Sequence, residues 1–188
     1  MVQGFPDSFF RIINADTGLC LAARSGGVSY GSQTEHDTWT GEGKEVAFSH
    51  TKDQVLGVVK PMGDRGEIWF IDNRKNSRGE EFWHLTNLNK DIRSWFNLHA
   101  SSRDFGEPTL PLSLHGAGRT DQNQWEARKR EGTQFYDFLP VPQGDGKRLV
   151  GLEPTGNGDY RAVLDDEGAP HQLWRFEEVT VPGETVPR

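Results

Sequence analysis

The chain has 188 residues and a formal net charge of −7. That length suits one domain, and the charge argues against nucleic-acid binding, because phosphate neutralisation needs a clustered cationic surface. No run approaches the roughly 20 apolar residues of a membrane span, and the N-terminus lacks the basic and apolar regions of a signal peptide. We therefore expect no membrane insertion, and either a cytoplasmic location or release by a non-classical route.

The composition favours β-structure without metal or cofactor. Twenty-two Gly and ten Pro beside 34% hydrophobic residues are typical of short strands joined by turns. The lone Cys20 can form no intramolecular disulfide, and the six His share no metal-ligand spacing. Cys20 lies in an apolar stretch, no Gly-x-Ser-x-Gly motif occurs, and the paired carboxylates fall in turns. The sequence thus predicts a protein that is not an enzyme.

The N-terminal part begins with two expected strands, residues 9–14 and 19–24, joined by an Ala-Asp-Thr-Gly turn. Residues 25–44 are rich in Gly, Ser and Thr and have too few apolar positions for two core-facing strands, so we expect a surface loop. This loop is either a long insertion in a first repeat or part of a degenerate fourth unit over residues 8–43.

Further along, Trp-centred segments recur at residues 80–85, 123–128 and 171–176. Each follows a polar turn and another strand-like run with period-two alternation, and a third such run lies further upstream. The inner runs are 67–73, 110–116 and 159–165, and the outer runs are 45–50, 92–98 and 134–141. We expect one domain over residues 1–188, with repeats at about 8–86 (carrying insertion 25–44), 87–130 and 131–180 and a tail at 181–188.

The sequence resembles the ricin B-type lectins in these segments. Asn123-Gln124-Trp125 and Gln172-Leu173-Trp174 are similar to the Gln-x-Trp motif of that family, and Glu81-Phe82-Trp83 is its acidic variant. The resemblance covers roughly residues 9–179 and implies a β-trefoil, in which three four-strand units surround a pseudo-threefold axis and six strands close a barrel. The Trp of each motif is then a core residue, and the polar residue before it bonds to backbone in its turn.

The resemblance also implies sugar binding. Pockets of this family combine an acidic residue that accepts sugar hydroxyls, an aromatic ring that packs on the sugar face, and an amide near the motif. Transferred to this chain, the pattern selects Asp64, Trp69, Asn73 and Glu81 in the first repeat, His115 and Asn123 in the second, and Glu153, Tyr160 and Gln172 in the third, beside His171. In no repeat do all three types align completely with the family pattern.

The expected function is therefore that of a lectin-like module whose partner is a glycan or glycoconjugate. The alternative is a protein-binding β-trefoil, a protease inhibitor or an adaptor, that acts through a surface loop such as residues 25–44. The repeated motif favours the first reading, and the incomplete pockets favour the second.

Overall fold

The computed structural model describes residues 3–25, 32–36, 43–47, 54–75, 78–91, 94–100, 110–115, 124–141 and 148–187. Within these ranges the regular structure consists of strands and one short 3-10 helix, η1 (Arg65–Glu67). The prediction of an all-β chain is confirmed. None of the described helical structure has the length and apolarity needed to cross a membrane.

The strands fall into groups along the chain. Their bounds are β1 (Phe9–Asn14), β2 (Cys20–Ser25), β3 (Ser32–His36), β4 (Gly43–Ala47), β5 (Gln54–Val59), β6 (Trp69–Lys75), β7 (Glu81–Asp91), β8 (Ser94–Ala100), β9 (Leu110–His115), β10 (Trp125–Lys129), β11 (Tyr136–Pro140), β12 (Arg148–Pro154), β13 (Tyr160–Asp166) and β14 (Trp174–Val179).

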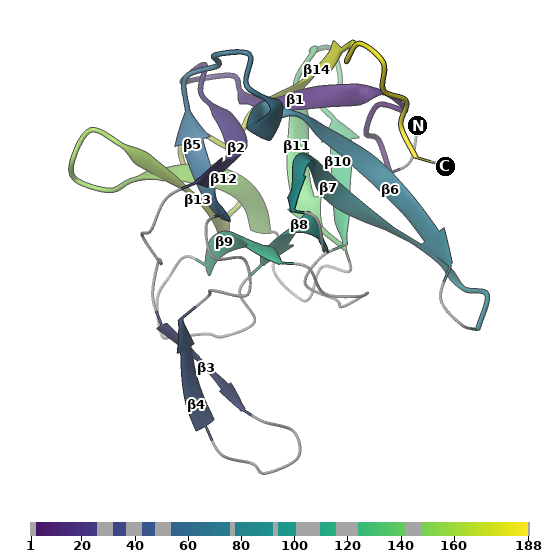
Figure 1. Cartoon of the computed structure of the whole chain (residues 1–188). Coiled ribbons are helices and arrows are strands. Elements are labelled where there is room, and N and C mark those ends of the chain that lie inside the picture. The colour runs from purple at the N-terminus through teal and green to yellow at the C-terminus, as the bar shows by residue number, and fades with distance from the viewer. Residues whose placement is uncertain are drawn as a thin grey trace.

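Six of these strands, β1, β6, β7, β10, β11 and β14, form a ring around the main core (Figure 1). Antiparallel ladders join β6 to β7, β10 to β11 and β14 to β1, and shorter ones join β1 to β6 and β11 to β14. Side-chain bonds connect β7 with β10, because Gln124 Nε2 donates to the Trp83 carbonyl at 3.0 Å and Trp83 Nε1 donates to the Trp125 carbonyl at 3.3 Å. Closing a sheet in this way removes most of its exposed edges.

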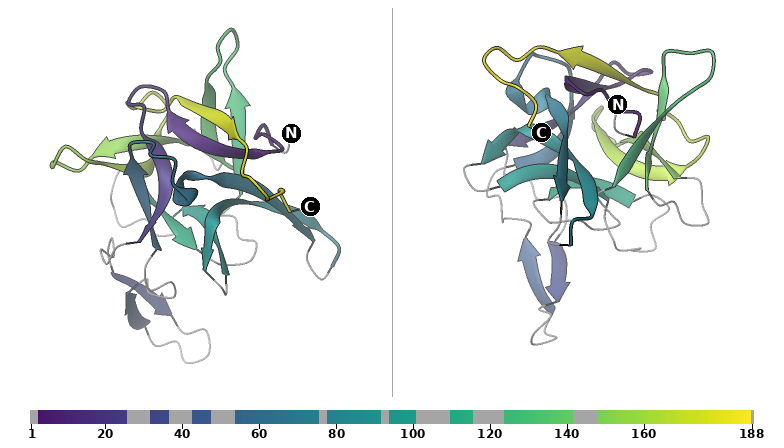
Figure 2. Two further views of the ribbon diagram at one scale, coloured as in Figure 1. Left: turned by 45° about the horizontal axis from the view of Figure 1, so that its top comes forward. Right: turned by 90° about the vertical axis from the view of Figure 1, so that its right-hand side faces the viewer.

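Three hairpins lie beyond the ring: β2 with β5, β8 with β9, and β12 with β13. They meet one another, since β9 pairs with β13 and β5 contacts both of these strands. The two chain ends lie close together on one side of the molecule (Figure 2). The turns that face solvent between these strands are where a binding site can form.

Three buried indoles organise the core. Trp69, Trp125 and Trp174 each begin a strand, are 0% exposed, and donate from Nε1 to a backbone carbonyl at 2.7–2.9 Å. Their acceptors are the carbonyls of Leu21, Leu98 and Val150. A buried indole N–H needs such a partner, so each bond fixes one Trp against an earlier strand.

The expected equivalence of Trp83 with Trp125 and Trp174 was wrong. Trp83 is only partly buried, at the edge of the main core, and Trp69 shares the environment of Trp125 and Trp174. Trp83 instead lies opposite Trp125, as Phe10 pairs with Trp69 and Tyr136 with Trp174. The repeat boundaries stated above stay a prediction.

Residues 32–36 and 43–47 do not form the expected loop. They pair with each other as β3 and β4, in a two-stranded sheet that is separate from the main one. This hairpin extends away from the ring in Figures 1 and 2. The strand expected at 45–50 is thus part of the projecting hairpin as far as Ala47, and β5 takes the place next to β2.

Candidate functional site

The turn regions around β13 and β14 gather several polar side chains on the molecular surface. The turn from β12 to β13 is closed by bonds from the Thr155 backbone N–H and hydroxyl to the Asp159 carbonyl, at 2.9 and 3.2 Å. Tyr160 follows directly and is partly buried, with one side packed against the main core. Its intermediate burial leaves part of the residue accessible to a ligand.

His171 lies beside this ring in an unusual backbone conformation. Its φ is +59°, in the left-handed region that costs a non-glycine residue of order 1–3 kcal/mol. The imidazole meets Tyr160 edge to face, with ring centroids 5.5 Å apart at 86°. Its Nδ1 is buried, lies 3.6 Å from Asp16 Oδ2, and has no hydrogen-bond partner among the described residues.

A buried Asn14 positions both Asp16 and His171. Its Oδ1 accepts from the backbone N–H groups of Asp16 and Thr17 and from the Thr17 hydroxyl, at 3.1–3.2 Å. Its Nδ2 donates to the His171 carbonyl at 2.8 Å. One fully buried side chain therefore joins the turn after β1 to the segment before β14, although the two are far apart in sequence.

Gln172 is a structural residue and not a sugar ligand, so that assignment was wrong. It is 4% exposed, its Oε1 accepts from the Gly168 N–H at 2.9 Å, and its Nε2 donates to the carbonyls of Asp166 and Asp165 at 2.8 and 3.3 Å. Gln124, directly before Trp125, donates instead to the Trp83 carbonyl on β7 at 3.0 Å, outside its own turn. The Gln172 turn packs so closely on β12 that a Cβ at Gly151 would lie 3.0 Å from Gln172 Cγ.

Glu153 on β12 and Arg161 on β13 lie on the paired strands that flank the turn before Tyr160. They are opposite each other in the β12–β13 ladder, and Arg161 Nε donates to Glu153 Oε2 at 2.6 Å. Both side chains are about one-third exposed, at 32% for Glu153 and 34% for Arg161. The carboxylate predicted as the acidic member is thus held by a cation but still open to solvent.

We name Asp16, Tyr160 and His171 together the Tyr160 cluster. It offers a ring face, an imidazole and a carboxylate, which between them can pack on a C–H surface and both donate and accept hydrogen bonds. The geometry fits a small hydroxylated ligand held at the surface.

The residues predicted in the first repeat do not come together. Trp69 was wrongly assigned as a sugar platform, because it is fully buried and its indole N–H is bonded to Leu21. Asp64 is exposed just before η1, at the start of β6. Asn73 and Glu81 are exposed near the far end of β6, where it turns into β7 (Figure 1).

The second-repeat prediction is only partly described by the structure. His115 lies at the end of β9 opposite Asn97, and its side chain falls outside the described residues. Asn123 falls outside them altogether, as does Trp39 in the N-terminal stretch. These positions stay predictions.

Several solved structures are similar in fold to this chain. No family model and no curated protein matches the chain. Among solved structures, the Macrolepiota procera ricin B-like lectin in complex with lactose aligns at a TM-score of 0.54 and 10% identity, over 95% of this chain and 99% of that one. A Caenorhabditis elegans protein of unknown function aligns at 0.59 and 17%, over 94% and 98%.

A further structure, described as the BEL β-trefoil in an apo crystal form, aligns at a TM-score of 0.53 and 13% identity, over 94% of this chain and 97% of that one. The chain therefore has a β-trefoil fold, and it shares that fold with a ricin B-like lectin. The resemblance seen in the Trp-centred segments is confirmed at this level.

Proposed function

We propose that the protein is a carbohydrate-binding, lectin-like module without catalytic activity, and that the Tyr160 cluster is its binding site. The observation that carries the proposal is the partly accessible Tyr160, whose ring lies edge to face against His171, with the Asp16 carboxylate beside the imidazole. A sugar presents a C–H face to such a ring and hydroxyls to the surrounding polar atoms. The fold shared with a lactose-bound lectin supports the same class of ligand.

The backbone at His171 also supports the proposal. Strained non-glycine residues concentrate at functional sites, where the surrounding structure holds a side chain in place. Here Asn14 supplies that hold by bonding the His171 carbonyl. The chain therefore carries an imidazole at a position whose backbone conformation a glycine would adopt more easily.

The test is a glycan array on the wild-type protein, followed by calorimetric titration of the best ligand. Tyr160→Ala should weaken binding by about tenfold or more, roughly 1.4 kcal/mol, since it removes the ring face. Tyr160→Phe should stay within about threefold, because it keeps the ring and its packing.

His171→Gly gives a sharper variant than alanine. Glycine suits the positive φ, so the fold should keep its stability while the ligand loses the imidazole. Arg128→Ala, at an exposed position on β10, is the control and should bind as the wild type does. A wild type that binds nothing on a broad array, or a ligand indifferent to Tyr160→Ala and His171→Gly, would refute the proposal.

A second candidate function is protein binding through the projecting hairpin. The observation in its favour is the separate β3–β4 sheet, whose strands pair with each other and not with the ring. A hairpin of this kind presents backbone groups along its outer edges, to which an extended partner segment can add. A pull-down partner that depends on residues 32–47 and is insensitive to Tyr160→Ala would support this function over the first.

A further inference from the structure

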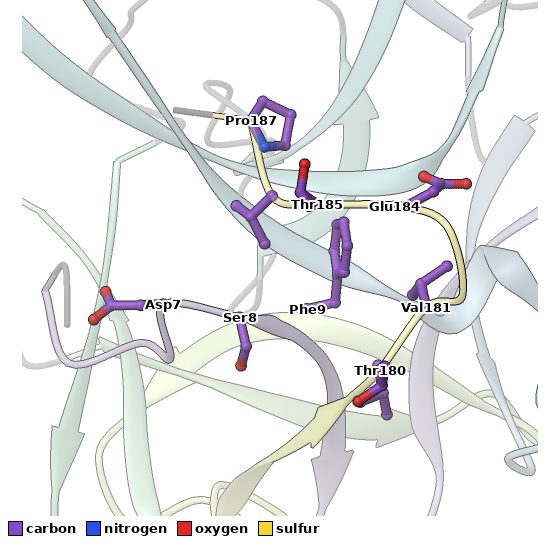
Figure 3. A pocket seen from close by; sticks show the side chains of 10 residues that line it. Asp7, Ser8, Phe9, Thr180, Val181, Glu184, Thr185 and Pro187 are labelled. Atoms are coloured by element: carbon purple, nitrogen blue, oxygen red, sulfur yellow. The ribbon is translucent and has the colours of Figure 1, made fainter.

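A surface crevice lies between the start of β1 and the segment that follows β14. Its volume is about 660 Å³, within the roughly 300–1,000 Å³ typical of small-molecule sites. Figure 3 shows Phe9 pointing into the space between the two segments, while the chain curves round from Thr180 through Val181 to Pro187. The crevice involves none of the residues of the Tyr160 cluster.

One wall of the crevice is apolar. Phe9 belongs to a second, smaller core with Ile68, Phe70 and Leu88, and its ring meets Phe70 edge to face at 5.8 Å. Val179, Val181 and Val186 are partly buried and pack against this core. These valines retain exposed surface, so the wall can cover an apolar group of a ligand.

Hydroxyl and carboxylate groups surround that wall. Ser8, Thr180 and Thr185 line the crevice, with Asp7 at one end. Ser8 Oγ donates a hydrogen bond to Glu178 Oε2 at 2.7 Å, and the same oxygen can still accept a hydrogen bond from a ligand. An aliphatic wall framed by hydroxyl groups is suited to a ligand that carries both hydroxyls and an apolar group.

The C-terminal segment is held in a defined position. Arg65 Nη1 donates to Glu184 Oε1 and Arg65 Nη2 donates to Glu184 Oε2 at 3.0 Å, in the bidentate arrangement that adds geometric specificity. The hydrogen bond to Glu184 raises the pKa of the Arg65 guanidinium. A turn closed by the Glu184 N–H and the Val181 carbonyl, at 3.1 Å, sets the curve of the chain.

We propose that this crevice is a second small-molecule site, for a glycoside that bears a short apolar aglycone. The apolar group lies on the valines and Phe9, and the sugar hydroxyls reach Ser8, Thr180 and Thr185. The site is independent of the proposed function at the Tyr160 cluster, because the two share no residue.

The test is an NMR titration of the full chain with n-octyl β-glucoside below its critical micelle concentration, beside glucose alone. We expect saturable shifts at the amides of Ser8, Thr180 and Thr185, and binding of glucose at least about fivefold weaker, since it lacks the apolar group. In the wild-type protein, nuclear Overhauser effects should connect the octyl chain with the Val181 and Val186 methyl groups, so this part of the test requires no substitution.

Two variants locate the ligand. Val186→Thr replaces a methyl by a hydroxyl at nearly constant volume and should weaken octyl glucoside binding at the crevice several-fold, while the shifts of the crevice amides should persist in Tyr160→Ala. Absence of saturable shifts at these amides, equal binding of glucose, or loss of the shifts in Tyr160→Ala would each overturn the proposal. Loss of array binding in Tyr160→Ala with intact crevice shifts separates the two sites.

Discussion

At the scale of single residues, each buried indole combines apolar packing with a hydrogen bond to backbone. Trp125 fills a core position among Phe138 and its neighbours and also donates to the Leu98 carbonyl at 2.9 Å. Its contribution therefore has two parts, apolar burial and one satisfied buried carbonyl. Trp83 makes a longer bond of 3.3 Å from a partly buried position.

The comparison of these two Trp gives a matched prediction. Trp125→Phe should lower the free energy of unfolding by about 2–3 kcal/mol, because it leaves a small void and an unpaired buried carbonyl. Trp83→Phe should cost about 1 kcal/mol or less, since water can reach its surroundings. Urea unfolding followed by circular dichroism measures both, and equal losses would show that burial of the indole N–H does not matter here.

Glu67 is a buried carboxylate that no motif or periodicity singled out. Its side chain is 0% exposed and accepts from the Met62 and Gly63 N–H groups at 2.6 and 2.9 Å, with Arg11 Nε at 3.6 Å. It therefore fixes the turn before β6 by satisfying two backbone donors with one charged group. Its role is structural, because each carboxylate oxygen accepts from a backbone donor of this turn.

We expect Glu67→Gln to lower the free energy of unfolding by roughly 2 kcal/mol, because the amide nitrogen cannot accept from a backbone N–H. Glu177→Gln is the control: Glu177 also faces Arg11, at 3.7 Å, but is 47% exposed, and its loss should stay within about 0.5 kcal/mol. Chemical denaturation of both variants decides the point, and a neutral Glu67→Gln would contradict the structural role.

At the scale of elements, the stretch between β2 and β5 is separable from the ring. Ser25 and Gln54 are paired residues at the open end of the β2–β5 ladder, so the chain leaves and returns at adjacent positions. The β3–β4 hairpin lies between these points and pairs only within itself. A short turn could therefore join β2 directly to β5.

Replacement of residues 27–52 by a four-residue Gly/Ser turn should leave a cooperatively folding domain, with a melting temperature within about 5 °C of the wild type. Sugar binding at the Tyr160 cluster should persist. Calorimetry and the glycan titration measure the two properties on the same sample. Loss of the cooperative transition would mean that this stretch belongs to the folding unit, as in the alternative of a degenerate fourth repeat.

At the scale of the whole molecule, period-two alternation was enough to predict most of the ring. It located the starts of β1, β6, β7, β10, β11 and β14 to within a few residues. It missed β12, whose run of Leu149 to Leu152 is continuously buried and does not alternate. The similarity to the Gln-x-Trp motif also selected Trp83 in place of Trp69, because the residues around Trp83 match that motif better and the two Trp lie on paired strands.

The candidate site was less predictable for a physical reason. Tyr160 and His171 lie near each other in sequence, and the sequence pattern around the third Trp-centred segment selected both residues. Asp16 joins them only because Asn14, on a strand paired with β14, bonds across to the His171 carbonyl. Such a contact depends on the closed ring, and nothing in the turn Ala-Asp-Thr-Gly reveals it.

A crystal structure of the protein with the strongest ligand from the glycan array is the decisive test of sugar binding at the Tyr160 cluster. We expect sugar density with a C–H face on the Tyr160 ring and hydroxyls within hydrogen-bond distance of His171 or Asp16. Density confined to another surface, with the Tyr160 ring uncovered at saturating ligand, would contradict it.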